Sequence, residues 1–185
     1  MTSITGRDPR SRGSAPAYDP YGRVMPLTDV APIEVSTEIA APPAAVWALV
    51  SDLTNMPRWS PQCRKTIVRG GPTREGAKLI NINRKGLLFW PTQAMVTEFV
   101  PEQRIAFKIR ENWTIWSFSL TPTADGGTRL VERRDAPKGI SDLSVKLTNA
   151  VLGGVDGFTE DLAKGMAQTL AKIKADAEAA VSAAA

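Results

Sequence analysis

The sequence contains no histidine and only one cysteine, Cys63, among its 185 residues. Histidine is the commonest general base near neutral pH and the commonest metal ligand. Its absence excludes Ser-His-Asp, Cys-His and zincin chemistries for this chain alone. We therefore expect no metal and no cofactor, and any catalysis would depend on Asp, Glu, Lys, Arg, Tyr or bound water. A lone cysteine forms no internal disulfide, which fits a reducing cytosol.

Long apolar runs are also missing. No segment approaches the roughly 20 apolar residues of a membrane helix. The N-terminal stretch MTSITGRDPRSRGSAP lacks the apolar centre of a secretory signal, so we expect a cytoplasmic protein. A composition of 43% hydrophobic and 23% charged residues is typical of a soluble globular chain. The length corresponds to one domain, or one domain with a tail, large enough to fold without a metal or a disulfide.

Regular patterning is absent from residues 1–32, so we interpret them as a flexible, proline-rich arm and place one folded domain at residues 33–181. The arm contains no apolar periodicity of the kind that a helix or a strand needs. Its prolines are Pro9, Pro16, Pro20, Pro26 and Pro32.

The folded part begins with a strand and a helix. Apolar and polar residues alternate over 33–40, which is the pattern of a half-buried strand. The segment APPAAVWALVSDL then places prolines in the first turn of a helix, where a missing N–H costs nothing. Val46, Leu49, Val50 and Leu53 fall on one face of that helix.

Six further strand-like segments follow, joined by short links, and they predict an antiparallel meander. Pro91 indicates that its strand has an edge position or a bulge there. Asp125 and Gly126 form a strong hairpin signal. The expected strands cover residues 64–70, 76–86, 87–100, 104–111, 113–122 and 125–134.

The C-terminal part changes to a helical period, with apolar residues every three or four positions from Leu143 to Ala177. We expect a break at Gly153-Gly154 and a long final helix over about 158–180, because glycine is costly inside a helix. A curved antiparallel sheet with one apolar face can bury that face against this helix. The predicted fold class is therefore α+β.

Four segments carry a resemblance to a known family: STEIAAPPAAVWALVSDLTNMPRWSP, VTEFVPEQRIAF, FSLTPTADGGTRLVE and LAKGMAQTLAKIKADAE. In order and spacing they resemble the SRPBCC group of START-like proteins, and within it the polyketide cyclase/dehydratase-like branch. The resemblance covers residues 33–180. It implies a helix-grip fold, in which the sheet wraps around the C-terminal helix and two short helices follow the first strand.

The same resemblance implies a deep cavity between sheet and helix. Family members hold apolar or amphipathic small molecules such as lipids, sterols, quinones, polyketides and plant hormones, and some catalyse ring closure and dehydration of polyketide chains. The family has no universal catalytic motif, so it assigns no catalytic residue here.

Strand alternation and the helical stripe give the candidate cavity residues, although each would equally fit an ordinary hydrophobic core. Alternation also predicts that Ile80, Ile105, Ile109, Leu120 and Leu130 point inward. The candidates are Trp59, Ile82, Trp90, Gln93, Phe107, Trp116, Phe118, Val155, Phe158, Leu162 and Met166.

Glu132 and Arg134 are the weak catalytic candidates, with Asn81 and Asn83 as further polar groups of the cavity. Glu132 shares a strand face with Leu130, so it can point inward, where burial would raise the pKa of its carboxyl and suit it to acid or base work. Arg134 lies on the same face and could polarise a carbonyl. The alternative is an exposed Glu–Arg ladder at a strand end.

Positive charge is concentrated between residues 58 and 85, where Glu75 is the only acid. This basic run can attract an anionic ligand, a phospholipid surface or nucleic acid, or it can simply solvate one face of a sheet. No nucleic-acid motif accompanies it, so we expect no nucleic-acid partner. The basic residues are Arg58, Arg64, Lys65, Arg69, Arg74, Lys78, Arg84 and Lys85.

Three functions are compatible with these observations. The favoured one is a protein that binds a hydrophobic or amphipathic small molecule, lipid or polyketide-like, in the cavity. The second is a metal-independent polyketide aromatase/cyclase or dehydratase. The third is a quinone or phospholipid carrier that contacts membranes transiently through its basic face. Whether the protein is an enzyme stays open, with binding favoured over catalysis.

Overall fold

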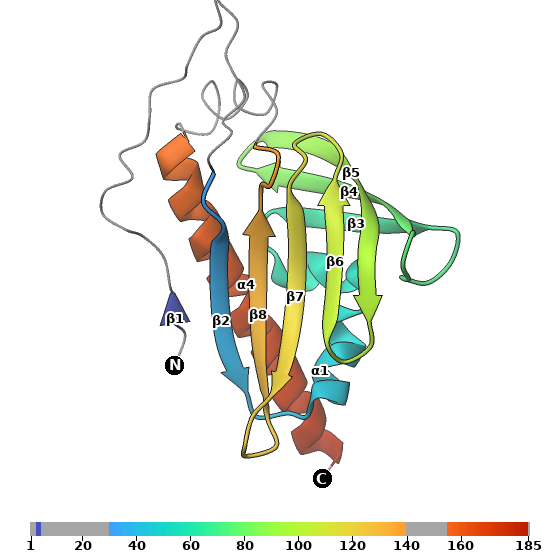
Figure 1. The fold of residues 1–185 in the computed structure, drawn as a ribbon, viewed down its shortest axis with the longest axis vertical. Coiled ribbons are helices and arrows are strands. Elements are labelled where there is room, and N and C mark those ends of the chain that lie inside the picture. The colour runs from blue at the N-terminus through green and yellow to red at the C-terminus, as the bar shows by residue number, and fades with distance from the viewer. Residues whose placement is uncertain (1–2, 5–29, 140–154, 185) are drawn as a thin grey trace, which may run out of the picture.

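One curved antiparallel sheet and one long C-terminal helix form the body of the protein (Figure 1). The computed structural model describes residues 3–4, 30–139 and 155–184, with the side chains of 3–4 and 155–158 outside that description. The strands are β1 (Ser3–Ile4), β2 (Ile33–Ile39), β3 (Cys63–Arg69), β4 (Lys78–Lys85), β5 (Leu88–Val100), β6 (Arg104–Ile109), β7 (Ile115–Pro122) and β8 (Thr128–Asp135).

The strand order is β1-β2-β8-β7-β6-β5-β4-β3, and every neighbouring pair is antiparallel. The predicted meander from β3 to β8 is confirmed, and β2 completes the sheet by pairing with β8. Most of the arm predicted at residues 1–32 lies outside the described residues. Its two-residue strand β1 pairs with β2, Ser3 opposite Ser36 and Ile4 opposite Val35.

Pro91 occupies an edge-like position, as expected. The register between β5 and β6 begins at Ala94 opposite Ile109, whereas Pro91 is paired only with Ile82 of β4. A proline nitrogen that donates no hydrogen bond is therefore tolerated at this point of the strand. The bulge of β5 lies further on, between Val96 and Glu98.

Two short helices follow β2, as predicted, and a 3-10 turn lies between them. They are α1 (Pro43–Val50), η1 (Leu53–Asn55) and α2 (Met56–Trp59). Val46, Val50 and Leu53 are buried on the face that the spacing predicted. Trp59 ends α2 with its indole ring buried in the core.

The long helix α4 (Val155–Ala184) spans the concave side of the sheet and packs on β2, α1 and α2 (Figure 1). The predicted helix is thus confirmed, with somewhat wider bounds, while the break expected at Gly153-Gly154 falls outside the described residues. Its buried stripe recurs every three or four residues and forms one side of the core. The stripe comprises Leu162, Met166, Leu170, Ile173 and Ala177.

Candidate ligand-binding site

An internal hollow of about 160 Å³ lies between the concave face of the sheet, α2 and the first turns of α4. In Figure 1 the start of α4, the β4–β5 turn, the β6–β7 turn and the end of β8 all lie at the upper end of the molecule. The apolar lining is Met56, Trp90, Phe107, Ile109, Trp116 and Leu162. The polar lining is Ser60, Gln62, Cys63, Asn81, Asn83, Thr92, Asn112, Glu132 and Arg134.

Glu132 lies on the concave face of β8 because side chains alternate along the strand and Leu130, two residues earlier, is fully buried. Its side chain is only 3% exposed, and its Oε2 atom has no hydrogen-bond partner. Burial raises the pKa of Glu132 well above the ordinary value of 4.5. The protonated form is therefore favoured, and such a carboxyl can donate one hydrogen bond and accept others.

Arg134 follows on the same face and is 4% exposed, opposite Trp116 of β7. Burial lowers the pKa of Arg134 to about 10, so the guanidinium stays charged at neutral pH. Within the described residues, Arg134 makes no hydrogen bond or ion pair. On the opposite face of the same strand the arginine is paired: Arg133 forms ion pairs with Glu34 at 2.9 Å and with Asp135 at 2.8 Å.

Amide side chains occupy the wall formed by β4 and β5. The Oδ1 atom of Asn81 accepts a hydrogen bond from Thr66 Oγ1 at 2.9 Å. Asn83 Nδ2 donates to Thr92 Oγ1 at 3.2 Å and to the carbonyl oxygen of Trp90 at 3.4 Å. These bonds orient one end of each amide and direct the other end, a donor on Asn81 and an acceptor on Asn83, to other partners.

Nine residues that the sequence predicted to point into the cavity line this hollow together: Asn81, Asn83, Trp90, Phe107, Ile109, Trp116, Glu132, Arg134 and Leu162. The proposed inward direction of Ile82 is wrong, and so is that of Ile80. The buried residue Leu79 and the lining residues Asn81 and Asn83 occupy the concave face of β4, so both isoleucines point to the opposite side.

Gln93 also points away from the hollow, because Trp90 and Thr92 supply the lining on β5. It is exposed, and its amide oxygen accepts from Arg110 at 3.5 Å. Trp59, Phe118 and Met166 are buried core residues that do not line the hollow. The side chains of Val155 and Phe158 lie outside the described residues.

Sequence reasoning missed several lining residues. Met56, Ser60, Gln62 and Cys63 come from α2 and its link to β3, where no periodic pattern predicts direction. Asn112 comes from the β6–β7 turn. Thr92 had a usable signal, because it lies two residues after Trp90 on a strand, and residues at that spacing share a face.

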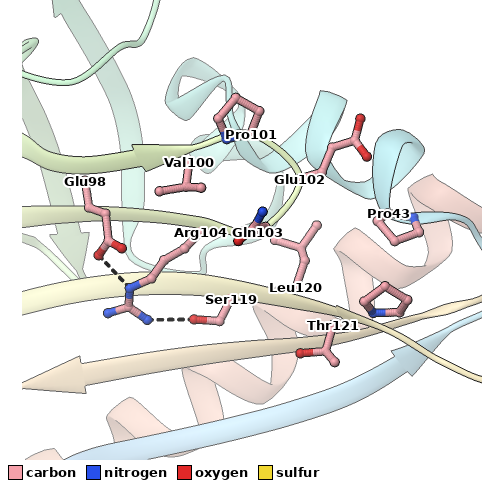
Figure 2. A pocket seen from close by; sticks show the side chains of 11 residues that line it. Pro43, Glu98, Val100, Pro101, Glu102, Gln103, Arg104, Ser119, Leu120 and Thr121 are labelled. Carbon is pink, nitrogen blue, oxygen red and sulfur yellow. Dashed lines mark hydrogen bonds and ion pairs between the residues drawn. The ribbon is translucent and has the colours of Figure 1, made fainter.

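A larger surface hollow of about 680 Å³ lies beside the β5–β6 turn (Figure 2). Exposed residues such as Val100, Pro101 and Glu102 form much of its wall. Figure 2 shows its one cationic group, Arg104, already engaged by Glu98 and by Ser119, each at 2.7 Å. The internal hollow is the better candidate site because it is less open to solvent than the surface hollow and contains buried polar groups without hydrogen-bond partners.

Among residues 3–4, 30–139 and 155–184, no three histidine, cysteine or carboxylate side chains gather in a way that could hold a metal ion. In the same part of the chain, no helix is both long and apolar enough to cross a membrane.

The Cys63 thiol is buried, which raises its pKa, and its Sγ atom lies 3.3 Å from Thr66 Oγ1.

A curved sheet that grips a long helix around an internal hollow defines the helix-grip class of START-like proteins. The chain belongs to the polyketide cyclase / dehydrase and lipid transport family, whose sequence profile matches residues 31–178. The resemblance seen in the sequence is thereby confirmed. No curated protein has a significantly similar sequence.

Solved structures share this fold. The di-domain ARO/CYC protein StfQ from the steffimycin biosynthetic pathway has a TM-score of 0.66 at 14% identity, over 82% of this chain and 51% of its own. A second di-domain ARO/CYC protein, BexL, has a TM-score of 0.61 at 19% identity, over 80% and 50%. The Mycobacterium smegmatis protein Ms6760 has a TM-score of 0.57 at 14% identity, over 93% and 99%. The chain thus spans about half the length of the two di-domain proteins.

The contribution of Glu132 to stability is expected to fall as pH rises above about 4.5, because its carboxyl ionises freely in the unfolded chain but keeps its proton to a higher pH in the fold. The stabilising contribution of Glu132 is fully present below the pKa that it has in the unfolded chain. It is lost as pH rises through the higher pKa that it has in the folded protein. Between the two, the free energy of unfolding changes by up to about 1.4 kcal/mol per pH unit.

Urea unfolding of the wild type and of Glu132→Gln between about pH 5 and pH 8 measures this contribution. The glutamine variant should lose that part of the pH slope, whereas Glu38→Gln, an exposed position on β2, should keep it. Equal slopes in all three proteins would contradict the raised pKa of Glu132.

Proposed function

We propose that the protein binds a small, oxygen-bearing aromatic or polyketide-like molecule in the internal hollow. The observation that carries this proposal is that two buried polar groups without hydrogen-bond partners lie on the same wall of the hollow. They are the Oε2 atom of Glu132 and the guanidinium of Arg134. Leaving a buried polar group without a partner costs about 1–3 kcal/mol. A ligand carbonyl or hydroxyl group placed between them would offset that cost.

The rest of the lining supports this class of ligand. Trp90, Phe107 and Trp116 offer flat contact surfaces for a ring, and Asn81 and Asn83 offer hydrogen bonds at the opposite wall. A lining with this many polar groups suits an oxygenated ring better than a bare hydrocarbon chain. The volume of about 160 Å³ is below the roughly 300–1,000 Å³ of pockets for drug-sized ligands, which favours one or two rings or one end of a longer molecule.

Titration with a dihydroxynaphthalene, followed by calorimetry and by the fluorescence of the tryptophans, tests the binding. We expect saturable binding that weakens at least about tenfold in Arg134→Gln, because a hydrogen bond to a charged group contributes about 1.5–3 kcal/mol. Naphthalene, which has the same rings without oxygen, should bind more weakly than the diol.

The matched control is Arg129→Gln, which removes the same charge from an exposed position on β8. It should bind the diol like the wild type. Equal affinity for the diol and for naphthalene would contradict the assignment of the polar wall. So would equal effects of the two arginine substitutions on diol affinity.

A second candidate function is cyclase or dehydratase chemistry at the same two residues. It is favoured by the family description and by the protonated state that burial gives to Glu132. In dehydration of a β-hydroxy ketone, Arg134 would stabilise the negative charge that develops on the carbonyl oxygen. Glu132 would protonate the departing hydroxyl, which leaves as water, while a solvent water accepts the α-proton and the new carbon–carbon double bond forms. A proton from solvent would then restore the Glu132 carboxyl.

A further inference from the structure

We propose that the outer face of β3, β4 and β5 docks on an anionic lipid membrane. This docking face is the side of these three strands that points away from α4. It is defined by Lys65, Ile67 and Arg69 of β3, by Lys78, Ile80, Ile82 and Arg84 of β4, and by Phe89, Pro91 and Met95 of β5.

Strand register places these residues side by side. Ile67 pairs with Ile80, and Lys65 pairs with Ile82, which in turn pairs with Pro91. The next row joins Arg69, Lys78 and Met95, and Arg84 pairs with Phe89. The opposite, concave face of the same strands carries Leu79, Asn81, Asn83 and Thr92, so the assignment of the two faces follows from alternation.

The docking face exposes large apolar side chains where an outer sheet face is ordinarily polar. Phe89 is 56% exposed, Met95 45% and Ile67 40%. Leu87, in the turn between β4 and β5, is 93% exposed. Grouped exposed apolar side chains of this kind mark a surface that contacts a partner.

Positive charge predominates on the face, although the Glu111 carboxylate accepts hydrogen bonds from the backbone N–H of Gln93 on β5. Lys65, Arg69 and Lys78 belong to none of the ion pairs among the described residues. The guanidinium of Arg84 lies 5.0 Å from the ring centre of Phe89. From residue 63 to residue 97 the sequence holds one acid, Glu75, which lies in the β3–β4 loop rather than on a strand of the face.

The outer face of β2 and β8 serves as an internal comparison. There Arg133 is paired with Glu34 and Asp135, so that surface is charge-balanced. A lysine on the edge strand β3 would discourage strand pairing between copies, but that role does not account for Phe89 and Met95 on the inner strand β5. Carboxylates thus neutralise Arg133, whereas Lys65, Arg69 and Lys78 have no such partner among the described residues.

An anionic membrane satisfies both properties of the face. Basic side chains attract acidic headgroups, while exposed aromatic and aliphatic side chains enter the boundary between headgroups and acyl chains. A second copy of this chain would bring cations against cations, and a purely charged polyanion would leave the apolar side chains in water. The site also lies outside the internal hollow, so docking and ligand binding are separable.

Co-sedimentation of the full chain with phosphatidylcholine vesicles, with and without phosphatidylglycerol, tests the proposal. We expect binding to the phosphatidylglycerol vesicles only, weakening as salt is raised. The double variant Lys65→Gln/Arg69→Gln should bind about 25-fold more weakly, since each basic residue near an anionic surface contributes about fivefold. Phe89→Ser should weaken binding while retaining the salt dependence.

The matched control is Arg129→Gln/Lys172→Gln, which removes two exposed charges from β8 and α4 and should bind vesicles like the wild type. Circular dichroism and dihydroxynaphthalene titration of all variants show whether fold and hollow are unchanged. No binding to anionic vesicles, equal binding to neutral ones, or equal effects of the two double variants would overturn the proposal. So would a dimer that the Lys65/Arg69 variant disrupts, in the absence of vesicle binding.

Discussion

Glutamine in place of Glu132 is expected to lower the turnover of the proposed cyclase or dehydratase reaction by about 10²–10⁴-fold, the usual contribution of a general acid or base. The amide has nearly the shape of a protonated carboxyl, so it fills the same buried position and still offers hydrogen bonds to a ligand oxygen. It cannot deliver a proton, however. Turnover should therefore fall while affinity for an oxygenated ring stays near that of the wild type.

Steady-state assays with a β-hydroxy ketone or a poly-β-ketone, together with calorimetric titration, separate the two quantities. Glu98→Gln is a suitable control because that carboxylate contacts Arg104 at the surface hollow rather than the internal one. A variant at Glu132 with undiminished turnover would remove the proposed acid. Loss of binding together with turnover would make Glu132 a binding group only.

Arg134 supplies a second readout of the same chemistry. If it stabilises a developing oxyanion, Arg134→Gln should lower turnover more than ground-state binding, because the charge on the carbonyl oxygen grows toward the transition state. Lysine at this position keeps a charge but not the forked geometry of the guanidinium, so it should restore function only in part. This ordering distinguishes a reacting site from a passive binding site.

The fold was predictable to the level of single strands because alternation and helical spacing record which side chains must be buried. Local sequence alone predicts three of these elements. They are the strand Ile33–Ile39, the helical stripe from Leu162 to Ala177 and the turn at Asp125-Gly126. The resemblance then supplied what local patterns do not contain, namely that the sheet curves around the last helix.

The site was predictable only in part, because an apolar side chain obeys the same pattern whether it lines a hollow or fills a core. On β4 the pattern misled, since the isoleucines face outward and the asparagines face the hollow. Burial preferences predict the reverse direction for both residue types. That reversal is itself informative: an apolar outward row and a polar inward row are what a ligand site inside and a docking surface outside would both require.

Glu132 and Arg134 were recoverable because they follow Leu130 at the strand period. Their position along β8 gave their direction, and only their unpartnered state required the structure. Residues of the α2–β3 link, such as Ser60 and Cys63, follow no strand or helix period that would predict the direction of their side chains. Their direction depends on how the chain turns at Trp59, which tertiary packing decides.

The largest loss of stability is expected from Trp59→Ala. Trp59 is 1% exposed, and its indole N–H donates to Asp176 Oδ2 of α4 at 2.7 Å, so the ring both fills the core and ties the short helix α2 to the long one. Truncation of such a side chain costs about 3–5 kcal/mol. Because folded domains are stable by only about 5–15 kcal/mol, this variant should populate unfolded molecules at modest denaturant.

Trp59→Phe separates packing from hydrogen bonding. It retains an aromatic ring but removes the N–H, so about 1.5–3 kcal/mol of the loss should appear in this variant. Asp176→Ala should lose a similar amount and show strong coupling to Trp59→Phe in a double-mutant cycle.

Arg58 provides the matched control, because it reaches the same Asp176 oxygen at 2.8 Å from an exposed position. Its substitution by glutamine should cost about 0–1 kcal/mol, as an exposed ion pair does. If urea unfolding gave Arg58→Gln and Trp59→Phe equal losses, the connection between α2 and α4 would be electrostatic. Independent effects of Trp59→Phe and Asp176→Ala would show that the ring acts by packing alone, and Trp59 would then be a core residue without a specific partner.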